Sequence, residues 1–448
     1  VVPLRQLLIV RDQLPWPGSK ATAGVITALV TEGDPRQPRY LALTFFFMVA
    51  LVLGNDDQGF AWWHSEIPIA GLSALGAAIA YTSPFSLGGS YLMGMRTCVG
   101  FLVGAVVLMG MSKLGLTPPE VAETPHRFFW PGLGFLVSSG LMLIAINWRT
   151  IADAFRSLSA ISNSTEADSD SILSGRTLVW AAIGACLVAA SVLHFIFQVS
   201  ILLIIMLIAI GGFFQNIIAT RAAAQTAFNP ARVMGILLQG MSALLGGSSA
   251  AINLTGAGFV AGTGAQAGTL TGDLAYGRWF GVPARHQFFT QLATILPCTV
   301  VSALVFTQIN TPGALALDGG HHAAPVAKMW AASAIMFDRG VDALPPNALW
   351  ALAIGGAVGA LYTLLERVKV LARWLPESVG IGLGLVLSVS TGITFFIGGF
   401  IMWIVLGRWL KMKDVTLTTI AVGSIVAEGI GGVLKPALIK LGLIHLGG

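Results

Sequence analysis

A dense group of polar side chains follows one of the most apolar stretches of the chain. Amides, hydroxyls and one guanidinium gather within residues 211–230, and Pro230 then breaks a helix and frees backbone carbonyls. Polar groups at membrane depth are costly and usually face a cavity. We therefore predict that this segment binds a polar solute. The alternative is a helix end in ordinary solvent. The predicted solute-binding residues are Gln215, Asn216, Arg221, Gln225 and Asn229.

A second candidate lies in the Gly- and Thr-rich segment 262–279, which ends with Asp273, Tyr276 and Arg278. We add Asp273 and Tyr276 to the predicted solute site. The glycines could allow close helix packing, or an unwound backbone whose carbonyls face a solute. Asp273 and Arg278 could instead form a pair at a helix end. The segment is not a dinucleotide-binding motif, because no strand precedes it.

Glu428 is the acid most isolated by apolar sequence, between Ile425 and Ile430. An acid without water around it can bind and release a proton, and we predict that Glu428 couples transport to protons. The alternative is a permanent ion pair with an arginine of another helix, such as Arg96.

Other reactive residue types do not form a site by spacing. An exposed turn is the favoured interpretation of Asn55–Asp57, and a loop that of His321 and His322. His194 is interpreted as a packing residue. The three cysteines, Cys98, Cys186 and Cys298, all lie in apolar runs, and we predict that they are buried packing thiols. We predict no bound metal and no cofactor. No phosphate-binding loop or Ser/His/Asp set is present in the sequence, so we predict no ATP-driven mechanism and no enzyme.

The composition requires a membrane around the elements that carry these residues. Of 448 residues, 55% are hydrophobic and 10% are charged, and the mean hydropathy is +0.80. Soluble domains carry about 25% charged residues. The net charge of +5 fits basic cytoplasmic loops and gives no reason to expect nucleic acid.

About a dozen apolar runs approach the length of a spanning helix. They predict an all-α, polytopic transmembrane bundle with two related halves and broken or re-entrant helices. Basic loops near Arg373 and Arg408 leave too few residues between them for two ordinary spans. We therefore predict that Val379–Thr391 is not part of one straight, full-length span.

The predicted organisation is a first half at 1–156, a polar linker at 157–176 and a second half at 177–448. The first half is shorter, so we expect further N-terminal spans before Val1. The segments Ala80–Gly89 and Leu387–Gly399 are weakly similar, since both place hydroxyl residues before a Gly-Gly pair and a helix. Related halves around a central site are common in carriers.

Three segments, in order along nearly the whole chain, resemble the oligopeptide transporter (OPT) superfamily and its yellow-stripe-like and bacterial branch. They are Val2–Ala23, with Pro-Leu-Arg and Pro-Trp-Pro; Gly268–Gly277 with Pro283–Gln287; and Ile425–Ile430. Ala275 and Tyr276 stand where that branch commonly has Lys-Thr. The resemblance implies about sixteen spans in two halves. It also implies proton-coupled import of small peptides, glutathione-like thiols or metal–chelator complexes.

We predict a proton-coupled secondary transporter for one of those solutes. Its partners would be membrane lipid, protons and a small polar solute, with a homodimer as an option and no nucleic acid. The predicted location is a prokaryotic inner (plasma) membrane. The alternatives are a metal-dependent lipid-modifying enzyme using Asn55–Asp57, which lacks a second acidic cluster in the sequence, and an oligomeric channel.

Overall fold

The structure, a computed structural model, divides into two compact units. Unit 1 comprises Val1–Lys20 and Gly140–Pro346, and unit 2 comprises Ala21–Ser139 and Asn347–Gly448. Each unit takes chain from both sides of the predicted linker, so the division into halves at 157–176 stays a prediction. The described residues are 1–30, 36–55, 62–64, 66–68, 79–113, 129–146, 172–226, 229, 231–244, 249–309, 330–331, 334, 337–338, 347–387 and 389–443.

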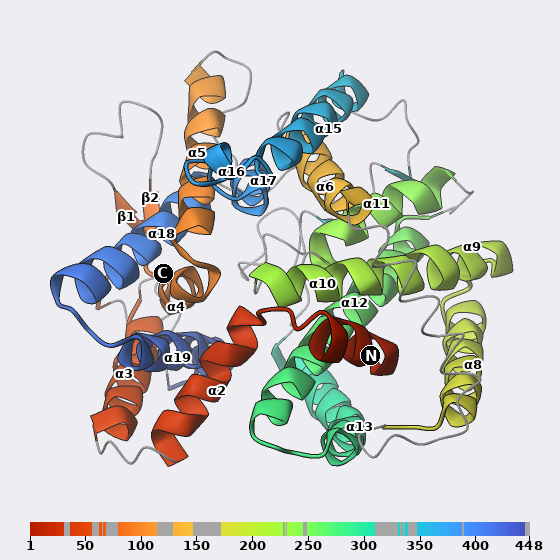
Figure 1. Cartoon of the computed structure of the whole chain (residues 1–448), viewed down its shortest axis with the longest axis horizontal. Coiled ribbons are helices and arrows are strands. Elements are labelled where there is room, and N and C mark those ends of the chain that lie inside the picture. The colour runs from red at the N-terminus through yellow and green to blue at the C-terminus, as the bar shows by residue number, and fades with distance from the viewer. Residues whose placement is uncertain are drawn as a thin grey trace. The chain divides into compact units, whose positions relative to one another are not determined.

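Unit 1 is helical throughout its described part (Figure 1). Helix α2 (Pro17–Val30) begins in unit 1 and continues into unit 2, and α6 (Phe129–Ile146) runs from unit 2 into unit 1. The other elements of unit 1 are α1 (Val2–Arg5), η1 (Gln6–Arg11), α8 (Gly175–Ser191), η2 (Val192–Ile196), α9 (Ile201–Met206), η3 (Leu207–Gln215), α10 (Asn216–Thr226), α11 (Ala231–Leu244), α12 (Ala250–Trp279) and α13 (Ala284–Ile309).

Unit 2 adds two short strands to a second set of helices. The strands β1 (Glu66–Pro68) and β2 (Ile79–Tyr81) pair antiparallel, with Glu66 opposite Tyr81. The helices are α3 (Arg36–Leu53), α4 (Pro84–Met93), α5 (Met95–Lys113), α15 (Ala348–Leu365), α16 (Lys369–Ala372), α17 (Ser378–Val386), α18 (Val389–Gly399), η5 (Phe400–Trp409) and α19 (Asp414–Lys440). The elements labelled η are π-helical.

Five helical stretches among the described residues are long and apolar enough to cross a membrane, or six if the bent pair α4–α5 counts as one span. Two of the five, in α8 and α13, have 6% and 0% of their apolar window buried. Apolar side chains on an outer face are stable in lipid and unfavourable in water. The all-α, polytopic membrane bundle is therefore confirmed. Cys186 and Cys298 lie exposed on these two helices, so their prediction as buried thiols was wrong, whereas Cys98 is buried.

Two helices are broken within unit 2. Helices α4 and α5 meet at an angle of 118°, where Gly94 takes a φ of 88° that residues with a Cβ rarely adopt. Helix α17 has only 9 residues and ends in extended backbone at Leu387 before α18 begins. The prediction that Val379–Thr391 is not one straight span is confirmed.

The two broken segments with similar sequences pack against each other. The Tyr81 amide donates to Thr394 Oγ1 (2.9 Å), and Ser90 Oγ donates to the Phe395 carbonyl (2.8 Å). Helix α17 approaches α5 closely, since a Cβ on Gly104 would lie 2.6 Å from the Gly384 Cα. The hydrophobic effect does not drive helices together in lipid. Small residues at such crossings let the backbones approach closely, and van der Waals packing then holds the helices together.

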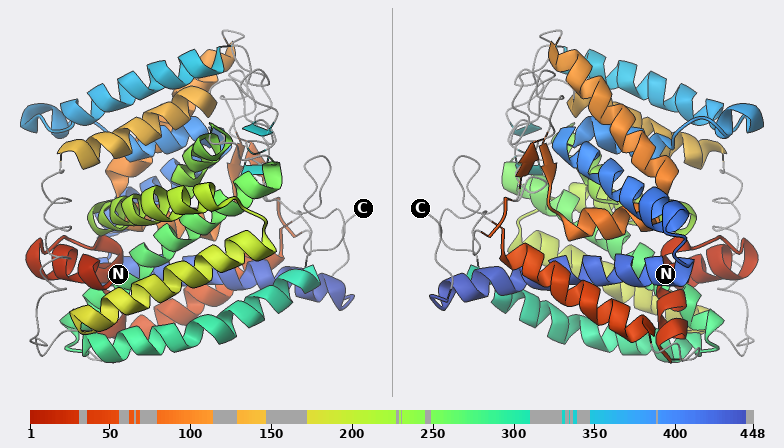
Figure 2. Two further views of the ribbon diagram at one scale, coloured as in Figure 1. Left: turned by 90° about the vertical axis from the view of Figure 1, so that its right-hand side faces the viewer. Right: turned by 90° about the vertical axis from the view of Figure 1, so that its left-hand side faces the viewer.

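Helices α3 and α19 of unit 2 are in contact and run side by side (Figure 2). The buried Gln37 joins them, because its Nε2 donates to Thr416 Oγ1 (3.1 Å) and its Oε1 accepts from Thr419 Oγ1 (3.2 Å). Both ends of this amide are satisfied, so α19 has a fixed register relative to α3.

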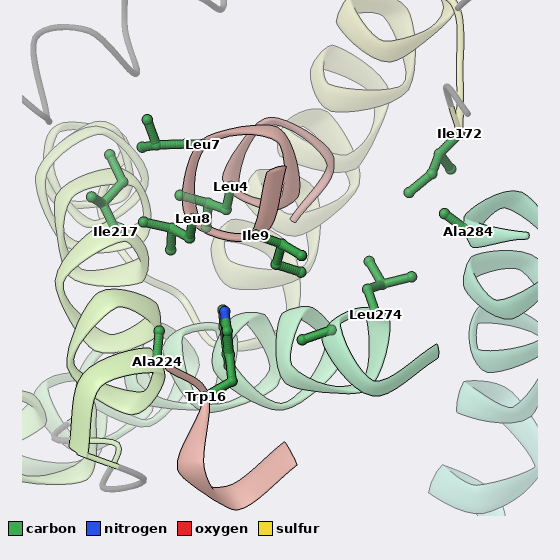
Figure 3. Packing of buried hydrophobic residues seen from close by; sticks show 11 residues of the cluster. Leu4, Leu7, Leu8, Ile9, Trp16, Ile172, Ile217, Ala224, Leu274 and Ala284 are labelled. Atoms are coloured by element: carbon green, nitrogen blue, oxygen red, sulfur yellow. The ribbon is translucent and has the colours of Figure 1, made fainter. Parts of the chain in front are cut away.

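In unit 1, Trp16 packs among aliphatic side chains of η1, α10 and α12 (Figure 3). Its backbone amide donates to the Ala224 carbonyl (2.8 Å), and its side chain is 3% exposed. Figure 3 shows Leu8, Ile217 and Ala224 around it. This cluster fixes the N-terminal segment of the chain against α10.

Glu366, at the end of α15 and outside the apolar spans, provides a test of the packing at that end of unit 2. Its Oε1 accepts from the Ser378 amide (3.0 Å), yet burial raises the pKa of its carboxyl above the usual value. A carboxyl whose pKa is higher in the folded than in the unfolded state contributes to the free energy of unfolding at low pH, and this contribution is lost as the pH rises through the folded-state pKa. Glu366→Gln cannot ionise, so the variant should not lose stability in this way as the pH rises. We expect its unfolding temperature to exceed that of the wild type by a margin that grows from pH 4 to pH 8. A constant difference across this range would contradict the prediction.

Candidate functional site

Polar side chains gather in unit 1 at the junction of η3 and α10. The π-helical segment η3 ends at Gln215, and such segments often occur at functional sites. Gln215 is 2% exposed, and its Nε2 donates to the carbonyls of Ala231 (3.1 Å) and Val260 (3.4 Å). Among the described residues, its Oε1 is buried without a partner. The Gln215 side chain is thus fixed through Nε2, and its Oε1 can accept a hydrogen bond from a solute.

Three neighbours of Gln215 also carry a buried polar atom without a partner among the described residues. These atoms are Asn216 Oδ1, Thr220 Oγ1 and Arg221 Nε. Asn216 and Thr220 are four residues apart and therefore share one face of α10. Buried polar atoms are nearly always paired in folded proteins, so a group of unpaired ones requires an explanation, such as a bound solute or water.

Arg221 forms an ion pair with Asp12, which follows η1. The distance from Arg221 Nη1 to Asp12 Oδ2 is 3.3 Å, and the two side chains are 15% and 18% exposed. Asp12 also accepts from Arg11 Nε (2.9 Å). The guanidinium therefore keeps its Nε for another anion. Asp12 was not predicted from the sequence, because its partner lies more than two hundred residues away.

Helix α12 supports this group with a face of small residues. A Cβ on Gly264 would lie 3.4 Å from both Asn216 Oδ1 and Gln215 Nε2. Asn229 Nδ2 donates to the Gly264 carbonyl (3.1 Å), and its Oδ1 accepts from the Ala231 amide (3.0 Å). Helix α12 is continuous from Ala250 to Trp279, so the alternative of an unwound backbone is excluded, and Gly264 serves close packing.

We expect Gly268→Ala to lower the stability of unit 1 by about 1–3 kcal/mol, because overpacking costs this much. A Cβ at this position would overlap the Asn229 amide, which is held by the hydrogen bonds described above. Gly262→Ala, on the same helix, is the matched control. Among the described residues, no atom outside the neighbouring backbone of α12 lies within 4 Å of its Cβ position, so the variant should be neutral or slightly stabilising. Unfolding temperatures of the purified proteins measure both effects, and equal temperatures for the two variants would refute the packing argument.

The remaining predicted residues lie apart from this group or outside the described side chains. Asp273 Oδ2 accepts from Gln291 Nε2 of α13 (2.7 Å), and Tyr276 hydrogen-bonds the same carboxylate. Gln225 is in α10, but its side chain is outside the described part. Arg278 Nη1 donates to the Ile9 carbonyl (3.1 Å), in place of the alternative pairing with Asp273.

Glu428 belongs to unit 2, where it contacts the first turn of α4. Its Oε2 accepts from the Phe85 amide (2.7 Å) and from Ser83 Oγ (2.9 Å). Arg96, the partner considered in the alternative, donates instead to the Leu375 carbonyl (2.8 Å). A helix N-terminus favours a negative charge through its free amides and its dipole. The carboxylate is thus held by hydrogen bonds to a broken helix. Ser83, which also caps α4, was not predicted.

The weaker candidates are placed only in part. His194 Nδ1 hydrogen-bonds the Val199 carbonyl (3.0 Å), as expected for a packing residue. Asn55 Oδ1 accepts from Lys435 Nζ (2.6 Å), while Asp56, Asp57 and residues 321–322 lie outside the described residues. The described residues contain no group of three or more potential metal ligands.

Comparison with known proteins identifies the family. The family model described as OPT oligopeptide transporter protein matches residues 1–116 and 129–438. A Saccharomyces cerevisiae protein that carries the provisional name of oligopeptide transporter is 24% identical over 297 residues, which is 63% of this chain and 40% of that protein. The chain thus aligns with about two fifths of the length of this relative. Because the family model covers nearly the whole chain, the protein belongs to the OPT oligopeptide transporter family.

Proposed function

We propose that this protein carries a short peptide or a similar zwitterionic solute across the membrane and that protons drive the transport. The observation that supports the solute site is a group of buried polar atoms on Gln215, Asn216, Thr220 and Arg221 that have no partner in the part of the chain that the structure describes. A solute that supplies a carboxylate and amide groups would satisfy such atoms. Asn229 fixes the start of α11 beside them, and Gln225 of α10 is retained as a proposed contact.

The chemistry of the group favours a peptide over an apolar solute. Arg221 can pair with a carboxylate through Nε and Nη, a geometry that planar guanidinium favours. The Oε1 of Gln215 and the Oδ1 of Asn216 can accept hydrogen bonds from an ammonium group or from amide N–H groups. Glutathione-like thiols and chelates that carry carboxylates offer the same groups, so they remain members of the proposed solute class. Asp273 and Tyr276 are proposed as contacts on the same pathway.

Proton coupling is proposed to use Glu428. The carboxylate accepts hydrogen bonds from Ser83 and from the amide of Phe85. Protonation would weaken these charge-assisted bonds, since bonds to an ionised acceptor are roughly twice as strong as neutral ones. The first turn of α4 would then be freed from α19. A change of this kind biases two conformations of a carrier by proton binding.

The test is uptake of radiolabelled di- and tripeptides into proteoliposomes that contain the full chain. With an acidic exterior, we expect the peptide to accumulate above its external concentration, and a protonophore should abolish the accumulation. Equilibration without accumulation would contradict proton coupling and support a channel or facilitator. No uptake of any peptide, with uptake of a metal chelate instead, would contradict the proposed solute. The predicted prokaryotic plasma membrane stays a prediction.

A further inference from the structure

A cavity of about 330 Å³ lies in unit 1 where α12 turns into α13. Its walls include two arginines, Arg5 of α1 and Arg278 of α12, together with Leu274, Pro283 and Ala284. Figure 3 shows Leu274 on α12 and Ala284 at the start of α13, with Ile9 of η1 on the same side of the cluster. The proposed solute site does not include these residues.

The charges around the cavity are positive. The Arg5 side chain is 2% exposed, and the bond from Arg278 Nη1 to the Ile9 carbonyl (3.1 Å) holds the second guanidinium at the wall. No acidic side chain among the described residues lines the cavity, and the nearby Asp273 carboxylate accepts from Gln291 instead.

The start of α13 adds to this charge. The helix has 26 residues and begins at Ala284, in the cavity wall. Its first amides have no partner within the helix, and its dipole places positive charge at this end. Two guanidiniums and a helix N-terminus around one cavity form a site for an anion such as phosphate, which accepts several charge-assisted hydrogen bonds.

The position of the cavity relative to the apolar span indicates where the anion comes from. The candidate span Ala284–Thr307 begins at the cavity wall, and none of its apolar window is buried. Val282 in the cavity wall is 43% exposed, and Trp279 and Phe280, which precede the wall residue Gly281 in the chain, are 45% and 39% exposed. Tryptophan at the end of a lipid-facing helix is typical of the headgroup region, and basic pockets there bind anionic headgroups.

We propose that this cavity binds the phosphate of an anionic lipid headgroup through Arg278 and Arg5. The phosphate and its attached alcohol occupy the cavity, and the acyl chains extend along the exposed apolar face of α13. Trp279 and Phe280 contact the glycerol region. This inference does not rest on the proposed transport function.

The experiment uses the full chain in a neutral detergent. Phosphatidylglycerol, phosphatidylcholine or inorganic phosphate is added, and binding is followed by native mass spectrometry and by the unfolding temperature. We expect phosphatidylglycerol to bind more tightly than phosphatidylcholine and to raise the unfolding temperature. Arg278→Gln should weaken phosphatidylglycerol binding at least about tenfold, because it removes a charged hydrogen-bond donor. The matched control is Arg285→Gln, an exposed arginine outside the cavity wall, and it should bind as the wild type does.

Several results would overturn the proposal. One is equal binding of the two lipids by the wild-type protein, which needs no variant and so does not depend on the folding of Arg278→Gln. A second is unchanged phosphatidylglycerol binding in Arg278→Gln. If inorganic phosphate raises the unfolding temperature as much as phosphatidylglycerol does at the same concentration, the cavity binds a soluble anion and the lipid assignment is wrong.

Discussion

Arg221→Gln is expected to lower peptide uptake by about two orders of magnitude, because loss of one partner of a buried charged contact typically costs 2–5 kcal/mol in binding. The reason is that Nε of Arg221 is buried without a partner among the described residues. This N–H group can therefore donate a hydrogen bond to a solute carboxylate. Asp12 keeps Arg11 as a partner, so the variant does not leave an isolated carboxylate. The loss of stability should therefore stay within about 1.5–3 kcal/mol, as for other hydrogen bonds to charged groups.

The matched control is Asp12→Asn, which breaks the same ion pair and leaves the guanidinium in place. If Arg221 binds the solute, this variant should keep most of its uptake, and its KM should change little. Arg176→Gln, an exposed arginine of α8, should have no effect. Equal losses of uptake in Asp12→Asn and Arg221→Gln would show that the ion pair has only a structural role.

Glu428→Gln is expected to abolish gradient-driven accumulation and to leave solute exchange in place. Glutamine keeps the shape of the side chain and an oxygen that accepts from the Phe85 amide and Ser83 Oγ, so the variant should fold. It cannot ionise, and it therefore mimics the protonated state at every pH. Counterflow of labelled peptide in preloaded proteoliposomes measures exchange, and uptake under an acidic exterior measures accumulation.

Glu366→Gln is the control for the loss of a carboxylate in unit 2. Glu366 lies outside the apolar spans and accepts from the Ser378 amide, so its replacement should leave accumulation unchanged. A Glu428→Gln protein that still concentrates peptide at the wild-type rate would show that the coupling site is elsewhere. A variant that neither exchanges nor accumulates peptide would show that Glu428 is needed for the fold or for solute binding.

The broken helix at Leu387 could be predicted from the sequence, since charge sidedness and the short distance between basic loops left no room for two spans. The bend at Gly94 between α4 and α5 could not, because Ser90–Met111 reads as one apolar run. Apolarity specifies burial in lipid but not the direction of the backbone. In the structure, α4 contacts α18 and α19, which are distant in sequence.

The sequence by itself determined the membrane class, the OPT family and the polar character of Gln215, Asn216 and Arg221, because composition and local order carry this information. Only the tertiary structure decided which of these atoms are satisfied. Asp12 forms an ion pair with Arg221, although more than two hundred residues separate them in the sequence. Glu428 accepts hydrogen bonds from Ser83 and Phe85 and forms none with Arg96. Asn229 donates a hydrogen bond to the Gly264 carbonyl. Hydrogen bonds depend on distances of about 3 Å between atoms. Sequence separation does not fix such distances when the two partners lie on different helices.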